Sequence, residues 1–301
     1  MAAWRALRVL VHLLAARTGL VAEGLAGKAL GALGPMHAAR ARPRAVTEWK
    51  SVAAAALGGA HKHLGVTVFA DGTGEIWQAR RGGPRRLQRL GHRGVKSASF
   101  SPQGHHVLTV SPSEAKLWSV ATGQLLDTFD AVRSAVFSPQ GEHVLTAEGK
   151  TAKVWSADGE LLHSFSGHYA NVASAVLSPD GKHVLTASLD ASARLWSVAT
   201  GKRETFVGHD DSLTSAVFSP DGNLFVTTSE DRTARMWSVD TGHRYTIWHD
   251  QAVTSAVFSP QGEHVLTASG YKAKLFNAST GELLHTFEHD HWVSSAVFSP
   301  Q

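Results

Sequence analysis

The chain has 301 residues, of which 43% are hydrophobic and 18% are charged, a balance that indicates a soluble globular protein with a sizeable core. It contains no cysteine, so disulfide bonds, thiolate nucleophiles and zinc sites with cysteine ligands are excluded. The formal net charge of +4 is unevenly spread, because residues 1–46 and residues 79–96 each carry seven basic side chains, against one acidic residue and none. Such blocks of like charge are usually solvated faces or tails.

Residues 1–44 precede the repeats described below and begin with a pattern typical of a basic amphipathic helix. Arg5, Arg8 and His12 lie opposite an apolar face at helical spacing, formed by Trp4, Leu7, Leu10, Val11 and Leu14. An arginine-rich, acid-poor start is typical of an organelle transit peptide, whereas the absence of serine argues against one. We therefore expect a cytoplasmic protein with a basic extension that is helical or, alternatively, directs it to a mitochondrion or plastid. No apolar run approaches the roughly 18 residues of a membrane-spanning helix, so we expect no membrane span.

From residue 45 onward the sequence repeats itself. The segment Ser134–Ala147 is identical to Ser255–Ala268. An aromatic residue closes each unit, at spacings of 41, 37, 41, 41 and 39 residues: Trp77, Trp118, Trp155, Trp196, Trp237 and Phe276. A period of this length predicts an array of similar supersecondary units, here within one domain at residues 45–301.

Each unit divides into four short segments rich in Val, Phe, Thr and Leu, which predicts four β-strands. In one unit, Val253–Ser259 leads through a Pro-Gln-Gly turn to His264–Ala268, and then come Ala273–Phe276 and a fourth run. Proline presets φ at the second position of such a turn, and glycine tolerates the positive φ that closes it. A single four-stranded antiparallel sheet cannot bury both of its faces. We therefore expect an all-β protein in which the sheets stack radially as a β-propeller.

The motifs of these units resemble those of the WD40-repeat family over residues 47–301. The closing Trp is followed by Ser, as in Trp196-Ser197, where the family often has Asp. The other motifs stand at matching offsets: Gly-His pairs at Gly91-His92, Gly167-His168 and Gly208-His209, and Ser-x-Asp turns at Ser188–Asp190 and Ser229–Asp231. A single pair would be weak evidence, but six units in register make the resemblance specific. It implies a WD40-type β-propeller that acts as a scaffold for protein interactions.

In that family a buried tetrad of Asp, His, Ser or Thr, and Trp links a turn to a strand. Two units carry all four residues: His168, Thr186, Asp190 and Trp196, and His209, Thr227, Asp231 and Trp237. The combination resembles a catalytic triad, but its hydroxyl meets an indole N–H, which only donates, so we interpret the tetrads as structural. The chain also lacks a glycine-rich phosphate loop, an H-E-x-x-H motif and a nucleophile elbow. We expect no enzymatic activity, no cofactor and no metal, since histidines without ligand geometry are weak evidence for a metal site.

The other four units depart from the tetrad pattern. Three have a turn that is one residue shorter and lack the aspartate; they close at Trp118, Trp155 and Phe276. The first unit keeps Thr67, Asp71 and Trp77 but has no upstream histidine. Residues 295–301, SAVFSPQ, repeat the opening of a unit. We therefore expect six blades plus the first strand of an incomplete seventh.

The loops before the first strands differ between units that are otherwise uniform. The resemblance implies that these loops meet on the narrow face of a propeller and bind a protein or peptide partner. We predict the following partner-binding residues: Arg93, Lys96, Arg133, Tyr169, Asn171, Asp210, Asp211, Asp250 and Trp292. The alternative is a nucleic-acid-associated propeller whose basic segment 79–96 neutralises phosphates. Against it, that segment has no aromatic residue to stack on bases, and the rest of the repeat region is acidic.

Overall fold

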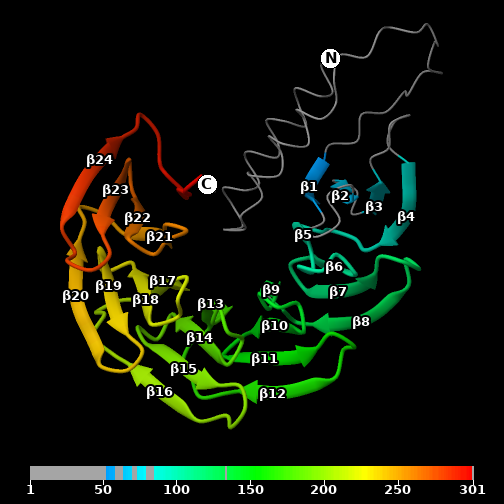
Figure 1. Ribbon diagram of the computed structural model, residues 1–301, viewed down its shortest axis with the longest axis horizontal. Coiled ribbons are helices and arrows are strands. Elements are labelled where there is room, and N and C mark those ends of the chain that lie inside the picture. The colour runs from blue at the N-terminus through cyan, green and yellow to red at the C-terminus, as the bar shows by residue number, and fades with distance from the viewer. Residues whose placement is uncertain (1–51, 58–63, 70–72, 79–84, 133, 300–301) are drawn as a thin grey trace, which may run out of the picture. The chain divides into compact units, whose positions relative to one another are not determined.

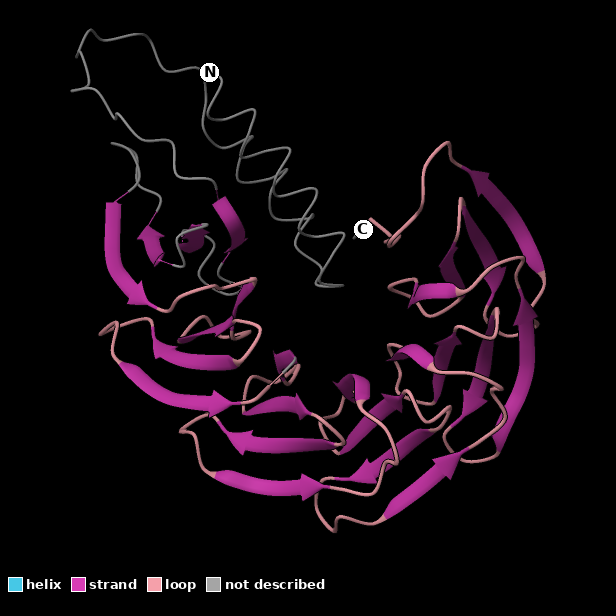
Figure 2. Ribbon diagram, turned by 180° about the vertical axis from the view of Figure 1, so that it is seen from behind, coloured by secondary structure: helices cyan, strands magenta, loops and turns pink. Residues whose placement is uncertain are grey.

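The computed structural model describes residues 52–57, 64–69, 73–78, 85–132 and 134–299. Every regular element among them is a β-strand (Figures 1 and 2). The N-terminal extension expected at residues 1–44 lies outside the described residues. In the described ranges, no helix has the length and apolar character needed to cross a membrane.

The described strands form six antiparallel four-stranded sheets, each made of consecutive strands. The first sheet contains β1 (Val52–Leu57), β2 (Leu64–Phe69), β3 (Thr73–Gln78) and β4 (Arg85–Gly91), and the second contains β5 (Ser97–Phe100), β6 (His106–Val110), β7 (Glu114–Ser119) and β8 (Leu125–Asp130). The third contains β9 (Ser134–Phe137), β10 (His143–Glu148), β11 (Thr151–Ser156) and β12 (Leu161–Phe165), and the fourth contains β13 (Val172–Leu177), β14 (His183–Ser188), β15 (Ala193–Ser197) and β16 (Arg203–Phe206). The fifth contains β17 (Leu213–Phe218), β18 (Leu224–Ser229), β19 (Thr233–Ser238) and β20 (Gly242–Trp248), and the sixth contains β21 (Val253–Phe258), β22 (His264–Ser269), β23 (Lys272–Asn277) and β24 (Leu283–Glu288).

The chain divides into two compact structural units, each much larger than one sequence repeat, and each is considered by itself. They are called the first and second unit from here on. The first unit contains β1–β6 together with Lys116–Leu125, and the second contains Leu126–Phe298 together with Ser113–Ala115. In the second unit the third to sixth sheets follow one another, with the first strands β9, β13, β17 and β21 innermost and the fourth strands β12, β16, β20 and β24 outermost (Figure 1).

The turn between the first and second strand of a sheet explains the repeated Ser-Pro-x-Gly phrase. Between β9 and β10, the Gly141 N–H donates to the Ser138 carbonyl at 2.8 Å. Gly141 has a φ of 74°, which a residue with a side chain rarely adopts. Ser138 Oγ accepts a hydrogen bond from the backbone N–H of His143 at 3.1 Å, so the serine satisfies a donor at the start of β10. The turn predicted from this phrase is therefore confirmed.

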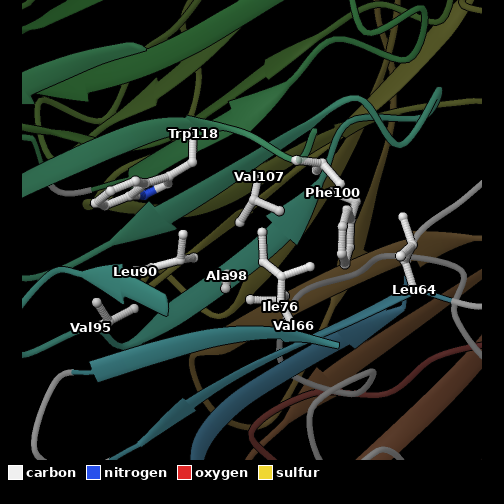
Figure 3. Close-up of a cluster of buried hydrophobic side chains, with 10 residues drawn as sticks. Leu64, Val66, Ile76, Leu90, Val95, Ala98, Phe100, Val107 and Trp118 are labelled. Atoms are coloured by element: carbon white, nitrogen blue, oxygen red, sulfur yellow. The ribbon is translucent and has the colours of Figure 1, made fainter. Parts of the chain in front are cut away.

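Apolar side chains pack between neighbouring sheets in each unit. In the second unit, Phe206 of β16 contacts Phe225 and Trp237 of the next sheet, with ring centroids 4.9 and 5.5 Å apart. In the first unit a buried cluster joins the first and second sheets (Figure 3): Leu64, Val66, Ile76, Leu90, Val95, Ala98, Phe100, Val107, Trp118 and Val120. Burial of such side chains is the dominant favourable term in folding, at about 25 cal/mol per Å² of apolar surface.

Residues 293–299 are not in a strand, although Ser295–Phe298 has the same sequence as β9. In β9 the SAVF residues pair with β10, which follows them along the chain. A strand needs a neighbour because its backbone N–H and C=O groups must find hydrogen-bonding partners. The first strand expected for a seventh repeat, at residues 295–301, is therefore not among the strands of the described residues.

Candidate functional site

The fourth sheet brings together the first predicted tetrad near the start of β13. Asp190 Oδ2 accepts a hydrogen bond from His168 Nδ1 at 2.9 Å, and His168 Nε2 lies 2.8 Å from Thr186 Oγ1. Trp196 Nε1 donates to the same hydroxyl oxygen at 3.0 Å. Because His168 Nδ1–H donates to the carboxylate of Asp190, Nε2 of the neutral ring accepts the hydroxyl proton of Thr186. One chain of hydrogen bonds therefore links the loop before β13 to strands β14 and β15.

The fifth sheet repeats this geometry with the second predicted tetrad. Asp231 Oδ2 accepts from His209 Nδ1 at 2.7 Å, and His209 Nε2 lies 2.8 Å from Thr227 Oγ1. Trp237 Nε1 donates to Thr227 Oγ1 at 2.8 Å. The histidine, threonine and tryptophan of both tetrads are buried, so neither network is open to solvent.

The carboxylate of each tetrad also accepts hydrogen bonds from its own turn and from the loop. Asp190 Oδ1 accepts from the backbone N–H and the hydroxyl of Ser192 at 3.0 and 2.6 Å, and Asp190 Oδ2 accepts from the Tyr169 N–H at 2.8 Å. Burial alone would raise the pKa of Asp190, but the hydrogen bonds outweigh burial and hold this pKa well below its ordinary value. Burial lowers the pKa of His168, with Asp190 opposing that effect. At neutral pH a charged carboxylate therefore faces a neutral imidazole.

This geometry suits the anchoring of a loop. The side chains of His168 and Asp190 are only 1% and 6% exposed. A general base must come within hydrogen-bonding distance of a substrate proton, and both ring nitrogens of His168 already have partners within the protein. The tetrads hold the loops before β13 and β17 against their sheets.

Asp190→Ala is expected to lower the free energy of unfolding at pH 7 by about 1–3 kcal/mol, because it leaves the buried His168 Nδ1–H without its acceptor. Urea denaturation followed by circular dichroism measures the change. Asp240→Ala is the control, since Asp240 is exposed, and it is expected to change the free energy by less than about 0.5 kcal/mol. An Asp190→Ala protein of unchanged stability that had lost partner binding would contradict the structural role.

Sheets other than the fourth and fifth keep part of the network. In the first unit, His92 Nδ1 lies 2.7 Å from Thr109 Oγ1, and Trp118 Nε1 donates to that oxygen at 2.8 Å. The indole-to-hydroxyl bond also forms in two further pairs: Trp77 to Thr67 at 2.9 Å and Trp155 to Thr146 at 2.8 Å. Asp71, which the sequence places beside the first of these pairs, lies outside the described residues.

The sixth sheet holds a buried histidine with an incomplete set of partners. His249 is 8% exposed, and its Nε2 lies 3.3 Å from Thr267 Oγ1. Phe276 stands where the other sheets have tryptophan, and its ring packs edge to face against the His249 ring. His249 Nδ1 has no hydrogen-bonding partner among the described residues. Burial, with a smaller effect of Lys274, lowers the pKa of His249 to about 4, so the ring is neutral at neutral pH.

Most of the predicted partner-binding residues lie in exposed loops of the second unit. Tyr169 is 84% exposed and Trp292 is 53% exposed, while Asn171 is half-buried. Three acidic residues of the second unit are also exposed: Asp210, Asp211 and Asp250. Two basic residues of the first unit are exposed as well: Arg93 and Lys96. Arg133 lies outside the described residues.

The acidic loop residues differ in what already binds them. Asp250 lies 3.3 Å from Lys272 Nζ, an ion pair at the surface that contributes little to stability. Asp211 accepts a hydrogen bond from the Ser212 N–H, and the Asp210 N–H donates to the tetrad carboxylate of Asp231. The loop before β17 therefore presents Asp210 and Asp211 from a backbone that is tied to its sheet.

Sequence reasoning overlooked a recurring basic position. Five of the six sequence repeats have a lysine or arginine two residues before the closing aromatic residue: Lys116, Lys153, Arg194, Arg235 and Lys274. In the fourth sheet this residue, Arg194, lies opposite Thr186 of the tetrad and is only 4% exposed. The fixed distance from the aromatic residue was a signal that could have identified the position.

Comparison with known families agrees with this geometry. The profile described as "WD domain, G-beta repeat" matches the chain five times, at residues 84–119, 123–156, 159–197, 201–238 and 242–277, which together make up more than half of the chain. This chain belongs to the WD40-repeat family. WD40 repeats in general form β-propeller scaffolds that bind other proteins. No curated protein matches the chain.

The resemblance inferred from the sequence is therefore confirmed for residues 84–277 of this WD40 protein. Its family explains why tetrads recur at equivalent places in successive sheets, since each matched repeat spans the fourth strand of one sheet and the first three strands of the next, as residues 159–197 span β12 and β13–β15. In the part of the chain that the structure describes, no group of three or more His, Asp or Glu side chains is arranged to hold a metal ion.

Proposed function

We propose that this WD40 protein is a non-catalytic scaffold that binds a protein or peptide partner through the loops before its first strands, on the narrow face of a propeller. The partner contacts Tyr169, Asp210 and Asp211 in the second unit, and Trp292 extends the same surface. Tyrosine and tryptophan are among the residue types that contribute most to interface energies when they enter a pocket of the partner.

The observation that carries this proposal is the anchoring of the loops. The backbone N–H groups of Tyr169 and Asp210 donate to the tetrad carboxylates, while their side chains are exposed. A loop that is ordered before binding loses less conformational entropy on association, which favours affinity. The tetrads thus serve the proposed function indirectly, because they present unlike side chains from a uniform framework.

Partner capture with matched variants tests the proposal. The partner is isolated on immobilised protein and identified by mass spectrometry, and its affinity is then measured by isothermal titration calorimetry. Tyr169→Ala, and the double change Asp210→Ala with Asp211→Ala, are each expected to weaken binding about tenfold or more, which equals about 1.4 kcal/mol. Circular dichroism spectra are expected to stay unchanged, since all three side chains are exposed.

The opposite ends of the sheets supply the controls. Leu161 is 50% exposed at the start of β12, and Asp158 and Glu160 form an exposed acidic pair in the preceding turn. Leu161→Ala, and Asp158→Ala with Glu160→Ala, are expected to bind the partner as tightly as the wild type. If the loop variants and these controls bind equally well, the partner does not use this surface.

The alternative is nucleic-acid binding by the basic segment 79–96. In its described part, Arg85, Arg86 and Arg89 are exposed on β4, and Arg86 forms an ion pair with Glu75 at 3.0 Å. Binding of this kind weakens steeply with salt, because each neutralised phosphate releases counterions. RNA binding that is strongly salt-dependent and insensitive to Tyr169→Ala would favour this alternative.

A further inference from the structure

Arg194 is a buried cation without a counter-charge. It lies on β15, is 4% exposed, and forms no ion pair within the described part of the chain. Its Nε and Nη1 atoms are buried and have no hydrogen-bonding partner there. An arginine cannot release its proton at physiological pH, and burying an unpaired charge is unfavourable. This side chain therefore has the unused donors of an anion site.

A second guanidinium converges on the same point. Arg203, at the start of β16, is exposed and forms no ion pair with any described residue. A β-carbon placed on Gly167 would collide with Nη1 of Arg194 and with Nη1 of Arg203. The two guanidinium groups are thus neighbours across Gly167, and both lower the pKa of the nearby His168. Two like charges so close together attract an anion.

Arg203 and the backbone at Gly167 form the exposed side of this pair, whereas Arg194 itself is buried. Gly167 and Ser166 are exposed, and Gly167 has a φ of 138°, so it contributes no side chain that would cover the two arginines. The Arg194 guanidinium carbon lies 5.9 Å from the centre of the Tyr169 ring and 6.0 Å from that of Trp196, so two aromatic rings hold it in place. The exposed ring of Tyr169 joins this position to the proposed docking loop.

The neighbouring sheet shows that the pair is not a general property of the repeats. There, Arg235 and Trp237 lie against the equivalent glycine, Gly208, and no second guanidinium is among its three nearest atoms. Arg203 pairs in register with Trp196, whereas His243 pairs with Trp237, so a histidine replaces the second arginine. The fourth sheet therefore places two guanidinium groups over one exposed glycine, whereas the fifth sheet places one there.

We propose that Arg194 and Arg203 bind the phosphate group of a phosphorylated serine or threonine side chain on the partner. This inference rests on the proposed function, since the site adjoins Tyr169 of the docking loop. A phosphate monoester carries a charge of about −1.5 to −2 at pH 7, which matches two guanidinium groups, and its oxygens accept the paired N–H donors of arginine. A long polyanion fits less well, because residues 126–298 contain 20 acidic and 12 basic side chains.

Inorganic phosphate tests the site without knowledge of the partner. Titration of the full chain with phosphate, against chloride of equal ionic strength, is followed by calorimetry and by the thermal unfolding midpoint. The wild type is expected to bind phosphate saturably, and Arg203→Ala to bind about tenfold more weakly or worse. Arg203 is exposed, so this variant is expected to fold, and Arg194→Met removes the buried charge at similar length. Arg244→Ala, which removes an exposed charge from β20, is expected to match the wild type.

A phosphopeptide identifies the source of the phosphate. A pool of short peptides with a central phosphoserine and mixed flanking residues is expected to displace inorganic phosphate, whereas the same pool without phosphate is expected not to. Absence of saturable phosphate binding, or equal binding by Arg203→Ala and Arg244→Ala, would overturn the proposal. So would displacement by single-stranded RNA but not by the phosphopeptides. Partner capture that depends on Tyr169 and not on Arg203 would leave the proposed function standing and remove only the phosphate site.

Discussion

Replacing Phe206 by alanine is expected to lower the free energy of unfolding by about 3–5 kcal/mol, the range found when a buried phenylalanine is truncated to alanine. Phe206 is 5% exposed and ends β16. Its ring lies edge to face against Phe225, at 84° and 4.9 Å, and against Trp237, at 72° and 5.5 Å. The substitution removes the aromatic contact between the fourth and fifth sheets and leaves a cavity that rigid strands cannot fill.

The adjacent residue is the control for this change. Val207 follows Phe206 directly but is 70% exposed, so Val207→Ala is expected to change the free energy of unfolding by less than about 0.5 kcal/mol. Urea denaturation of the two variants and the wild type, followed by tryptophan fluorescence, measures both values. Similar losses for Phe206→Ala and Val207→Ala would show that contacts between these sheets do not limit stability.

Acidification from about pH 6.5 to about pH 4 is expected to destabilise the protein by about 2–3 kcal/mol through His249 alone. Burial lowers the pKa of His249 from 6.5 to about 4 in the folded protein, with a smaller contribution from Lys274 and an opposing one from Asp250. The unfolded chain therefore takes up the proton first as the pH falls. The contribution to stability is complete above pH 6.5 and is lost as the pH approaches 4.

His249→Leu is expected to reduce this loss, because leucine does not titrate. Urea denaturation at about pH 7 and about pH 4.5 gives the difference in unfolding free energy for each protein, and the linked titration of His249 predicts a smaller difference in the variant. Trp248→Leu is the control, since Trp248 is 71% exposed and carries no titratable group. If His249→Leu loses as much stability as the wild type between the two pH values, another group is responsible.

The repeated sheets could be predicted from the sequence because their determinants are local. Four short apolar runs per unit, separated by turns such as the one at Ser138–Gly141, indicate strands without knowledge of distant contacts. Gly141 closes that turn with a positive φ, and this conformational freedom belongs to the residue itself. The same fixed offsets placed His168, Thr186, Asp190 and Trp196 as candidates for one network, and the structure brings them within hydrogen-bonding distance.

The expectation of a strand at residues 295–298 was wrong because strand formation also depends on contacts that are not local. Its four residues are identical to β9, so local propensity is the same, but β9 pairs with β10 whereas residues 295–298 are not in a strand. Strand formation depends on that pairing as well as on the sequence of the strand. A repeated phrase therefore predicts a strand only where pairing with a neighbouring strand also forms.

By itself, the sequence determined that this is a WD40 protein of repeated four-stranded sheets with two complete tetrads, since turn chemistry and motif spacing act over a few residues. Tertiary structure decided which polar side chains have partners. His249 and Arg194 look like ordinary members of the repeat, yet folding buries both with nitrogen atoms that have no hydrogen-bonding partner among the described residues. Arg203 reaches Arg194 only because β16 pairs with β15 beside Gly167. Such electrostatic properties depend on neighbours in space and on the loss of water, which no spacing in the sequence records.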